Sequence, residues 1–436
     1  MVTDKRTQRS LGSAWIISRR RFLKQTAMAT AVASVPYLAA RSAAFGKEQA
    51  KSADAALDRA LKDLVAMEGG PPGVIAVVQR GQHRKVHTFG VRNIKSGLPI
   101  RVDDRMRIAS VAKAFSGAVA LSLVSEGKLS LHDTIGKWLR ELLPEAWWEV
   151  TLRQLLNHTS GIFNYFDDEA FTQSLLAHPL QAHTPHELVA VATAHPPVFA
   201  PGTSWSYSNT NYIVIGLILE RVTHRSVSSL LRQRIIRPLR LHDTMYPTRS
   251  PNIPGYHAHG YLPPTLSDLF PPPWGGQNRY VDISRFSPTV TGAEGALISN
   301  PDDLRRFYRA LLSGQLLRPA QLAKMKTMVE LDPGFGYGLG LATTETPCGR
   351  IWGHNGSVPG YTTIAWNDES GRRGMVVGLP TEQDEAIAAA FDTVLATAAC
   401  RVFGRPVGST AAGVTAAGAV GVLPRVDHGL LAARAG

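Results

Sequence analysis

The chain has 436 residues, of which 44% are hydrophobic and 19% charged, a balance typical of a globular protein with one large or two smaller domains. Its formal charge of +13 is unevenly spread, because residues 1–44 hold eight Lys/Arg and one Asp and so carry +7 of it. No basic block with interleaved aromatic residues follows, so the composition argues against nucleic-acid binding.

The N-terminal segment has the layout of an export signal. Ser18-Arg19-Arg20-Arg21-Phe22-Leu23-Lys24 precedes a mildly apolar run from Thr26 to Ala40, and small residues follow up to Ala44. Paired arginines followed by Phe-Leu-Lys are typical of the twin-arginine type, although a basic arm before a short Ala-rich helix is the alternative. We expect residues 1–44 to be a twin-arginine signal peptide, so that the protein is secreted to the extracellular or cell-wall side by the twin-arginine export machinery.

The next elements predict the start of a sheet. Asp54 to Glu68 has the spacing of an amphipathic helix, and the runs Val74 to Gln79 and Lys85 to Val91 predict a β-hairpin. A mostly helical stretch is expected from Ile135 to about Pro247, and a long loop rich in Pro, Gly and aromatic residues from Pro251 to Pro288.

Ser110-Val111-Ala112-Lys113 opens an apolar helix that ends near Gly127. Residues i and i+3 share a helix face, so the Lys113 amine can reach the Ser110 hydroxyl. Serine is a weak nucleophile without an adjacent base, and an apolar environment favours the neutral, basic form of a lysine. Ser110 is therefore predicted to be a nucleophile activated by Lys113. Ser125-Glu126-Gly127-Lys128 is a second match, but it straddles the helix-ending glycine.

Two further segments carry groups that suit such a site. Tyr207 and Asn209 lie two residues apart, so both can face one cleft; a phenol near a lysine can relay a proton and an amide can bind substrate. His354-Asn355-Gly356-Ser357 begins a predicted strand, whose edge offers backbone N–H groups to an oxyanion. Taken alone, each segment has an ordinary structural explanation, and His158 is better explained as a structural histidine than as a base.

The C-terminal part predicts more strands and a closing helix. We expect helices from Pro301 to Ser313 and from Pro319 to Met328. The expected strands are Tyr337 to Ala342, Arg350 to Trp352, Tyr361 to Trp366 and Gly374 to Leu379, followed by a helix from Glu382 to Phe403. Cys348 and Cys400 are the full cysteine complement, and an exported chain makes a disulfide between them more plausible than two buried thiols.

The order Ser-x-x-Lys, Tyr-x-Asn, His-x-Gly resembles the serine β-lactamase and penicillin-binding protein superfamily, in its class C and DD-peptidase branch. Within it, the chain is most similar to soluble actinomycete D-alanyl-D-alanine carboxypeptidases, over roughly residues 53–404. The resemblance includes four further blocks: Arg107-Ile108-Ala109-Ser110, Leu155-Leu156-Asn157-His158-Thr159-Ser160-Gly161, Tyr337-Gly338-Leu339-Gly340-Leu341, and Gly353-His354-Asn355-Gly356 with Gly360-Tyr361.

The resemblance implies an α/β (α+β) fold, with an antiparallel sheet of five or more strands flanked by helices and a mostly helical domain inserted. The sheet domain would comprise residues 45–134 and 285–404, the inserted domain 135–284, and a C-terminal tail 405–436. It also implies a disulfide between Cys348 and Cys400.

The resemblance assigns roles to single residues. Ser110 would be the acylated nucleophile, Lys113 and Tyr207 the proton-transfer pair, Asn209 a substrate-positioning residue, and His354 an aid to charge and proton balance. Asn355, Gly356 and Ser357 complete the predicted substrate-binding strand, with the backbone N–H groups of Ser110 and Ser357 as the oxyanion hole. No metal or organic cofactor is implied.

The implied function is that of an exported serine hydrolase, a D-alanyl-D-alanine carboxypeptidase acting as a monomer on peptidoglycan stem peptides and acylated by β-lactams. Two departures leave the substrate open, because Ala342 stands where the relative has a carboxylate-binding Arg and Asn355 where it has Thr. The alternatives are an esterase, a β-lactamase, a D-amino-acid peptidase or amidase, and a non-catalytic wall-binding protein.

Overall fold

A computed structural model describes residues 54–276, 278–346 and 349–403. Contacts divide the chain into residues 1–55 and 56–436, and the description that follows concerns the second of these units. The predicted signal peptide and the tail 405–436 lie outside the described residues, as do Cys348 and the side chain of Cys400. The disulfide therefore stays a prediction.

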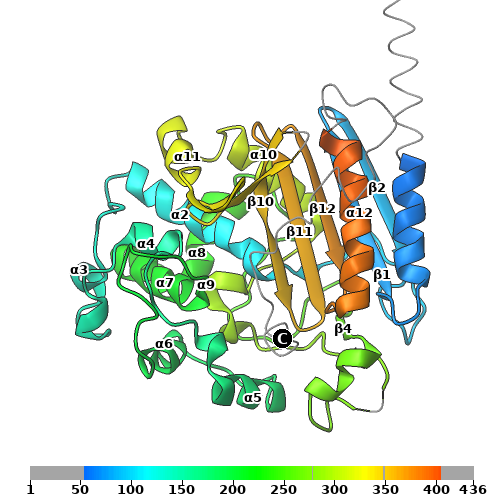
Figure 1. Ribbon diagram of the computed structural model, residues 1–436, viewed down its shortest axis with the longest axis horizontal. Coiled ribbons are helices and arrows are strands. Elements are labelled where there is room, and N and C mark those ends of the chain that lie inside the picture. Colours follow the sequence, from blue (N-terminus) through cyan, green and yellow to red (C-terminus); the bar gives the residue numbers. More distant parts are fainter. Residues whose placement is uncertain (1–53, 277, 347–348, 404–436) are drawn as a thin grey trace, which may run out of the picture. The chain divides into compact units, whose positions relative to one another are not determined.

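The centre of the fold is an eight-stranded antiparallel sheet with the strand order β2-β1-β12-β11-β10-β9-β8-β7 (Figure 1). The expectation of an antiparallel sheet of five or more strands is confirmed. The strands are β1 (Gly73–Arg80), β2 (His83–Gly90), β7 (Val329–Asp332), β8 (Phe335–Tyr337), β9 (Ala342–Thr346), β10 (Gly349–Val358), β11 (Tyr361–Asp368) and β12 (Arg373–Leu379).

Both faces of the central strands are covered by helices. In β1, seven of the eight residues are buried, which explains its nearly continuous apolar sequence. On one face of the sheet, residues such as Val74, Trp366 and Val377 pack with the helix at residues 56–66 and with α12 (Glu385–Phe403). Figure 1 shows α12 lying along the sheet. Ala365 and Val376 point the other way, into a cluster shared with α2 (Ala112–Ser125) and α10 (Pro301–Leu312).

The remaining helices gather beside the sheet, on the side of β10 in Figure 1. Among the described residues they are α3 (Ile135–Leu139), α4 (Leu152–Leu156), α5 (Glu169–Ala177), α6 (Pro185–Thr193), α7 (Asn209–Thr223), α8 (Val227–Leu231), α9 (Gly292–Gly295) and α11 (Pro319–Met325). Two short strand pairs, β3 (Met106–Arg107) with β6 (Ile298–Ser299) and β4 (Tyr261–Leu262) with β5 (Val281–Asp282), complete the fold.

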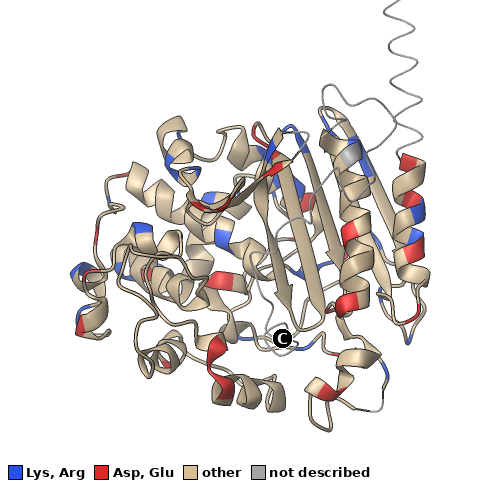
Figure 2. Ribbon diagram, viewed as in Figure 1, with Lys and Arg blue, Asp and Glu red and all other residues tan. Residues whose placement is uncertain are grey.

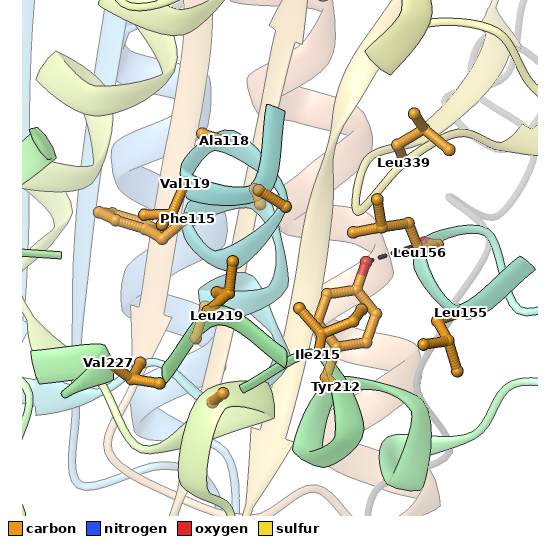
Figure 3. Packing of buried hydrophobic residues seen from close by; sticks show 14 of the residues in the cluster. Phe115, Ala118, Val119, Leu155, Leu156, Tyr212, Ile215, Leu219, Val227 and Leu339 are labelled. Atoms are coloured by element: carbon orange, nitrogen blue, oxygen red, sulfur yellow. Dashed lines mark hydrogen bonds between the residues drawn. The ribbon is translucent and has the colours of Figure 1, made fainter. Parts of the chain in front are cut away.

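Helix α2 runs through the middle of this packing. Eleven of its 14 residues are buried, as expected of a helix that is apolar all round. Phe115 and Val119 share a cluster with Ile215 and Leu219 of α7, and Figure 3 shows these side chains together. The predicted sheet region and the predicted helical region therefore share one core.

Helix α12 is long and apolar enough to cross a membrane, with a mean hydropathy of 1.6 in its most apolar window, and no other helix in the described part of the chain is. However, 59% of that window is buried within the protein. Its residues Ile387, Phe391 and Val394 are fully buried with sheet residues such as Trp366. We therefore interpret α12 as a core helix.

The expectation of one strand from Tyr337 to Ala342 is wrong. Strand β8 ends at Tyr337, β9 begins at Ala342, and the residues between them leave the ladder. Gly340 has φ +83° there, and its N–H bonds the Leu156 carbonyl oxygen at 3.2 Å instead of a strand partner. The glycines that look like strand alternation in the sequence thus form a turn against the helices.

Among its described residues, the predicted long loop from Pro251 to Pro288 is irregular apart from β4, β5 and a 3₁₀ turn (Pro264–Leu269). Buried Arg107 anchors both of its ends, because its Nη2 donates to the carbonyl oxygens of Pro251 at 2.6 Å, Ser284 at 3.2 Å and Phe286 at 2.9 Å. Burial lowers the pKa of Arg107. Both ends of the loop are therefore bonded to a residue that precedes Ser110 by three positions.

Candidate active site

Ser110 lies in a tight 3₁₀ turn (Ala109–Val111) that leads directly into α2. The preceding Ala109 has φ +47°, a left-handed conformation that costs energy for any residue with a Cβ atom. Such strain persists only where the surroundings enforce it, and here β3 fixes the chain before the turn while α2 continues after it. Ser110 is 3% exposed.

Lys113 lies one turn along, and its amine faces the Ser110 hydroxyl. Lys113 Nζ donates to Ser110 Oγ at 2.9 Å and to Asn209 Oδ1 at 2.7 Å. The side chain is fully buried, and the amine also lies 4.8 Å from the centre of the Tyr207 ring. The structure thus brings together four residues that the sequence separates by up to 99 positions: Ser110, Lys113, Tyr207 and Asn209.

Asn209 is the first residue of α7, whereas Tyr207 lies in the segment before it. This segment is held by the turn after α4: Ser206 N–H donates to the His158 carbonyl oxygen at 3.1 Å, and Ser208 N–H donates to His158 Nδ1 at 3.2 Å. The His158 ring packs 4.4 Å from the Tyr207 ring, centre to centre. The Leu155–Gly161 block therefore positions Tyr207.

His158 is buried and accepts hydrogen bonds at Nδ1, so its geometry is that of a structural residue rather than a base open to substrate. Burial, followed by the charge of Lys113 and by His354, holds its pKa well below the ordinary 6.5. Its φ of +64° places it in the turn that follows α4.

His354 on β10 is also fully buried, and both ring nitrogens have partners inside the protein. Nδ1 bonds the Asn355 carbonyl oxygen, which makes Nδ1 the donor, and Nε2 accepts from the Tyr337 hydroxyl at 2.9 Å. Its ring centre lies 6.4 Å from that of Tyr207. His354 thus reaches the site through ring contacts, and its assigned role in proton balance stays a prediction.

The buried histidine makes stability depend on pH. Burial and then the Lys113 charge lower the pKa of His354 to about 3, from 6.5 in the unfolded chain. The unfolded state therefore binds the proton more tightly, and the free energy of unfolding should decrease as pH falls from about 6.5 toward 3, by about 1.4 kcal/mol for each pKa unit that separates the two states.

Urea unfolding at several pH values measures this loss. His354→Gln should reduce it only partly, because the pKa of His158 is also lowered by burial. Replacing the exposed His178 with Gln is the matched control and should lose as much free energy of unfolding between pH 6.5 and 3 as the wild type does. If His354→Gln also lost as much as the wild type, His354 would not be a source of this pH dependence.

The predicted substrate-binding strand lies against the turn that holds Ser110. The ladder between β9 and β10 ends at the Ala342–Gly353 pair, so residues 354–358 of β10 continue past the end of β9. Alternate residues of a strand point to opposite faces. Gly356 faces the Ser110 turn, while Ser357 donates its hydroxyl to Glu382 Oε1 at 2.7 Å. Asn355 is buried on that same side.

Gly356 is required for this close approach. A Cβ atom at this position would lie 2.5 Å from the Ile108 carbonyl oxygen and 2.8 Å from the Ser110 nitrogen, so the backbone would have to move. We expect Gly356→Ala to lower kcat/KM by about 10²-fold, the loss associated with roughly 1 Å of misplacement. The control is Gly378→Ala on β12, where the new methyl group meets the flexible end of Met106 at 3.0 Å. Steady-state kinetics of the two variants measures the difference, and equal activity would contradict it.

Glu294 is a site residue that the sequence did not reveal. It lies in α9, and its Oε2 accepts from Lys113 Nζ at 2.6 Å, with exposed fractions of 3% for Glu294 and 0% for Lys113. Ser116 of α2 holds α9 in place by donating to the Ala293 carbonyl oxygen at 2.6 Å. An acidic residue inside the otherwise apolar run from Gly292 to Ile298 was the one signal available.

The second Ser-x-x-Lys match has a different environment. Ser125 is the last residue of α2, and exposed Lys128 pairs with Glu126 at 2.9 Å. Figure 2 shows basic and acidic residues interspersed over the surrounding helices. Within the described ranges, no three His, Cys, Asp or Glu side chains are grouped as metal ligands would be.

Comparisons with known proteins identify the family of the chain. The family model described as Beta-lactamase matches residues 57–397. A D-stereospecific amidohydrolase from Streptomyces sp. is 36% identical, with a TM-score of 0.68, and the match covers 78% of this chain and 97% of that one. The D-amino acid amidase from Ochrobactrum anthropi SV3 is 25% identical, with a TM-score of 0.69 and coverage of 79% and 98%.

Curated relatives lie in the same group. A D-aminopeptidase of Brucella anthropi is 28% identical over 322 residues, which are 72% of this chain but only 56% of the relative, so the chain spans little more than half of that protein. A penicillin-binding protein of Bacillus subtilis (strain 168) is 25% identical over 343 residues, covering 77% of this chain and 73% of the relative. With its large antiparallel sheet and a family match over most of its length, the chain belongs to the Beta-lactamase family of serine hydrolases and penicillin-binding proteins.

Proposed function

We propose that the protein is a serine hydrolase that forms an acyl-enzyme at Ser110 and cleaves amide bonds that follow a D-amino-acid residue. The observation that carries the proposal is the 2.9 Å hydrogen bond between Lys113 Nζ and Ser110 Oγ, since a serine needs an adjacent base to attack a carbonyl. Amide cleavage at D-residues is what the names of the Streptomyces amidohydrolase and the Ochrobactrum amidase state for those proteins.

The proposed chemistry uses these contacts. Lys113 takes the proton of Ser110 as its oxygen attacks the substrate carbonyl carbon, and the backbone N–H groups of Ser110 and Ser357 stabilise the oxyanion. Tyr207, half-buried beside Lys113, passes the proton to the leaving amine, and Asn209 holds both Lys113 and the substrate amide. The end of β10 beyond β9 offers its backbone to an extended substrate, as a sheet edge does to a peptide.

The environment of Ala342 favours an amidase or aminopeptidase over a carboxypeptidase. Ala342 is fully buried in an apolar cluster with Ile351, so this position presents no cation to a substrate carboxylate. The second function to be tested is that of a D-alanyl-D-alanine carboxypeptidase that acts on cell-wall peptides and is acylated by penicillins. The similarity to a penicillin-binding protein is the reason for testing it.

A matched set of substrates separates the two functions. We would compare an acyl-D-Ala-D-Ala peptide with a free carboxylate, the same peptide with a C-terminal amide, D- and L-phenylalanine amides, a p-nitrophenyl ester and a chromogenic cephalosporin. Preference for the amide-capped peptide and for the D-amide supports the proposal. Preference for the free carboxylate supports the carboxypeptidase, turnover of the ester or cephalosporin alone supports an esterase or β-lactamase, and turnover of none of them supports a wall-binding protein.

We further propose that the protein is exported by the twin-arginine route, on the basis of the sequence Ser18 to Lys24. Replacing Arg19 and Arg20 with lysine should keep the protein inside the cell, because the paired arginines are the feature read by that route. Fractionation of cells that express each form measures this. The control is Arg41→Lys, which lies after the apolar run, and export of the double variant at the wild-type level would contradict the proposal.

A further inference from the structure

The buried carboxylate of Glu294 raises the question of how Lys113 becomes a base. An ammonium group has three N–H bonds, and Lys113 Nζ has three acceptors within 3 Å: Ser110 Oγ at 2.9 Å, Asn209 Oδ1 at 2.7 Å and Glu294 Oε2 at 2.6 Å. The Glu294 carbonyl oxygen lies further away, at 3.4 Å. The resting geometry is therefore that of a protonated lysine that donates a hydrogen bond to the nucleophile.

A protonated lysine cannot accept the proton of Ser110. It must first lose a proton, and of its three near partners only the carboxylate is a base, since a hydroxyl oxygen and an amide oxygen are already neutral and bind protons very weakly. The carboxylate also has the shortest contact. Because both side chains are almost fully buried, a transfer that turns two charges into two neutral groups also removes part of the cost of holding charges in a low-dielectric interior.

We propose that Glu294 is the positioning residue that accepts a proton from Lys113 and so converts it into the base for Ser110. This inference rests on the proposed function. In the first step, the Lys113 ammonium gives one proton to the Glu294 carboxylate, leaving an amine and a carboxylic acid. In the second, the Ser110 oxygen bonds to the substrate carbonyl carbon while its proton passes to the Lys113 amine.

The cycle closes without a co-reactant. The proton from Ser110 passes on to the leaving amine as the C–N bond breaks, which leaves Lys113 neutral in the acyl-enzyme. Glu294 then returns its proton to Lys113, and the ion pair is restored. Water repeats the same sequence in deacylation, so Glu294 stores one proton in each half-reaction and touches no substrate atom.

Other titratable groups face the pair from each neighbouring element. They are Tyr212 of α7, whose ring lies 5.5 Å from Lys113 Nζ, Tyr207, His158, His354 and Tyr246. Burial and, to a smaller extent, the Lys113 charge lower the pKa of both histidines. Burial first, and then the charges of Glu220 and Glu294, raise the pKa of Tyr246. These shifts keep His158 and His354 neutral and Tyr246 protonated. None of these three groups therefore competes with Glu294 for the Lys113 proton near neutral pH.

The test uses the p-nitrophenyl ester, whose leaving group needs no proton, so that the rate reports the base step alone. Glu294→Gln keeps the length and one acceptor but removes the base. We expect its kcat/KM to fall by about 10²-fold or more, the usual contribution of general acid–base catalysis, with KM changed by less than about threefold. Glu294→Asp, which retains a carboxylate, should recover part of the loss.

The pH profile distinguishes proton storage from a merely structural pair. In the wild type, Lys113 becomes neutral by passing its proton to Glu294, so the pair exchanges no proton with solvent. In Glu294→Gln, the Lys113 ammonium must instead lose its proton to solvent. The acidic limb of kcat/KM should therefore move to higher pH in the variant. A limb that moves to lower pH, or activity within threefold of the wild type throughout, would overturn the proposal.

Two controls keep the result interpretable. Glu220→Gln makes the same change at a carboxylate that caps α8 by accepting from Val227 N–H at 2.9 Å, and it should behave as the wild type. The amplitude of the acyl-enzyme burst counts functional molecules, so partial unfolding of a variant does not imitate a slow step. A wild type that turns over none of the substrates would refute the proposed function itself, whereas an active wild type with an equally active Glu294→Gln would refute only the role of Glu294.

Discussion

Ser110→Ala is expected to lower kcat for ester and amide substrates by on the order of 10⁴-fold or more, because it removes the hydroxyl that we propose forms the acyl-enzyme. Removal of the hydroxyl takes away one acceptor of Lys113 but leaves the ion pair with Glu294 and the bond to Asn209 in place. The variant should therefore fold normally, with a melting temperature close to that of the wild type.

Mass spectrometry after incubation with a penicillin gives a second, independent readout. The wild type should gain one acyl group on Ser110, and Ser110→Ala should gain none. Ser125→Ala is the matched control, because it removes the serine of the other Ser-x-x-Lys match, and it should be acylated like the wild type. An adduct that persists in Ser110→Ala would place the nucleophile elsewhere.

Lys113→Met should abolish activity and also destabilise the fold by about 3–5 kcal/mol. The second effect arises because the substitution leaves the Glu294 carboxylate buried at 3% exposure without the charge that it faces at 2.6 Å. Since single substitutions seldom lower the free energy of unfolding by this much, the loss should be easily visible in urea unfolding.

The double variant Lys113→Met/Glu294→Met separates the two effects. Replacing both members of a buried ion pair with apolar residues of similar volume is often neutral or stabilising, so we expect stability close to that of the wild type and still no turnover. If the double variant were as unstable as Lys113→Met, the cost would come from packing around α2 rather than from the unpaired carboxylate. If either variant kept its activity, Lys113 would not be the base.

Much of the fold could be predicted from local patterns. The hairpin of β1 and β2, the strands β11 and β12 and the helices α10 and α12 lie within a few residues of their expected positions. Each is a continuous apolar run or a periodic pattern that the local sequence bounds, often with Gly or Pro. The strand expected at Tyr337 to Ala342 failed because the conformation of Gly340 depends on α2 and α4, which lie far away in the sequence.

The sequence by itself determined the order of the three motifs, and with it the spacing of Ser110 and Lys113 on one helix face, since an i, i+3 relation is fixed by helix geometry. Only the tertiary structure decided what surrounds the amine. Glu294 is 181 residues from Lys113, and the apolar residues around it mark it as unusual without indicating which residue it contacts. Its carboxylate meets the amine because α9 packs against α2, and long-range packing of this kind leaves no periodic trace in a single sequence.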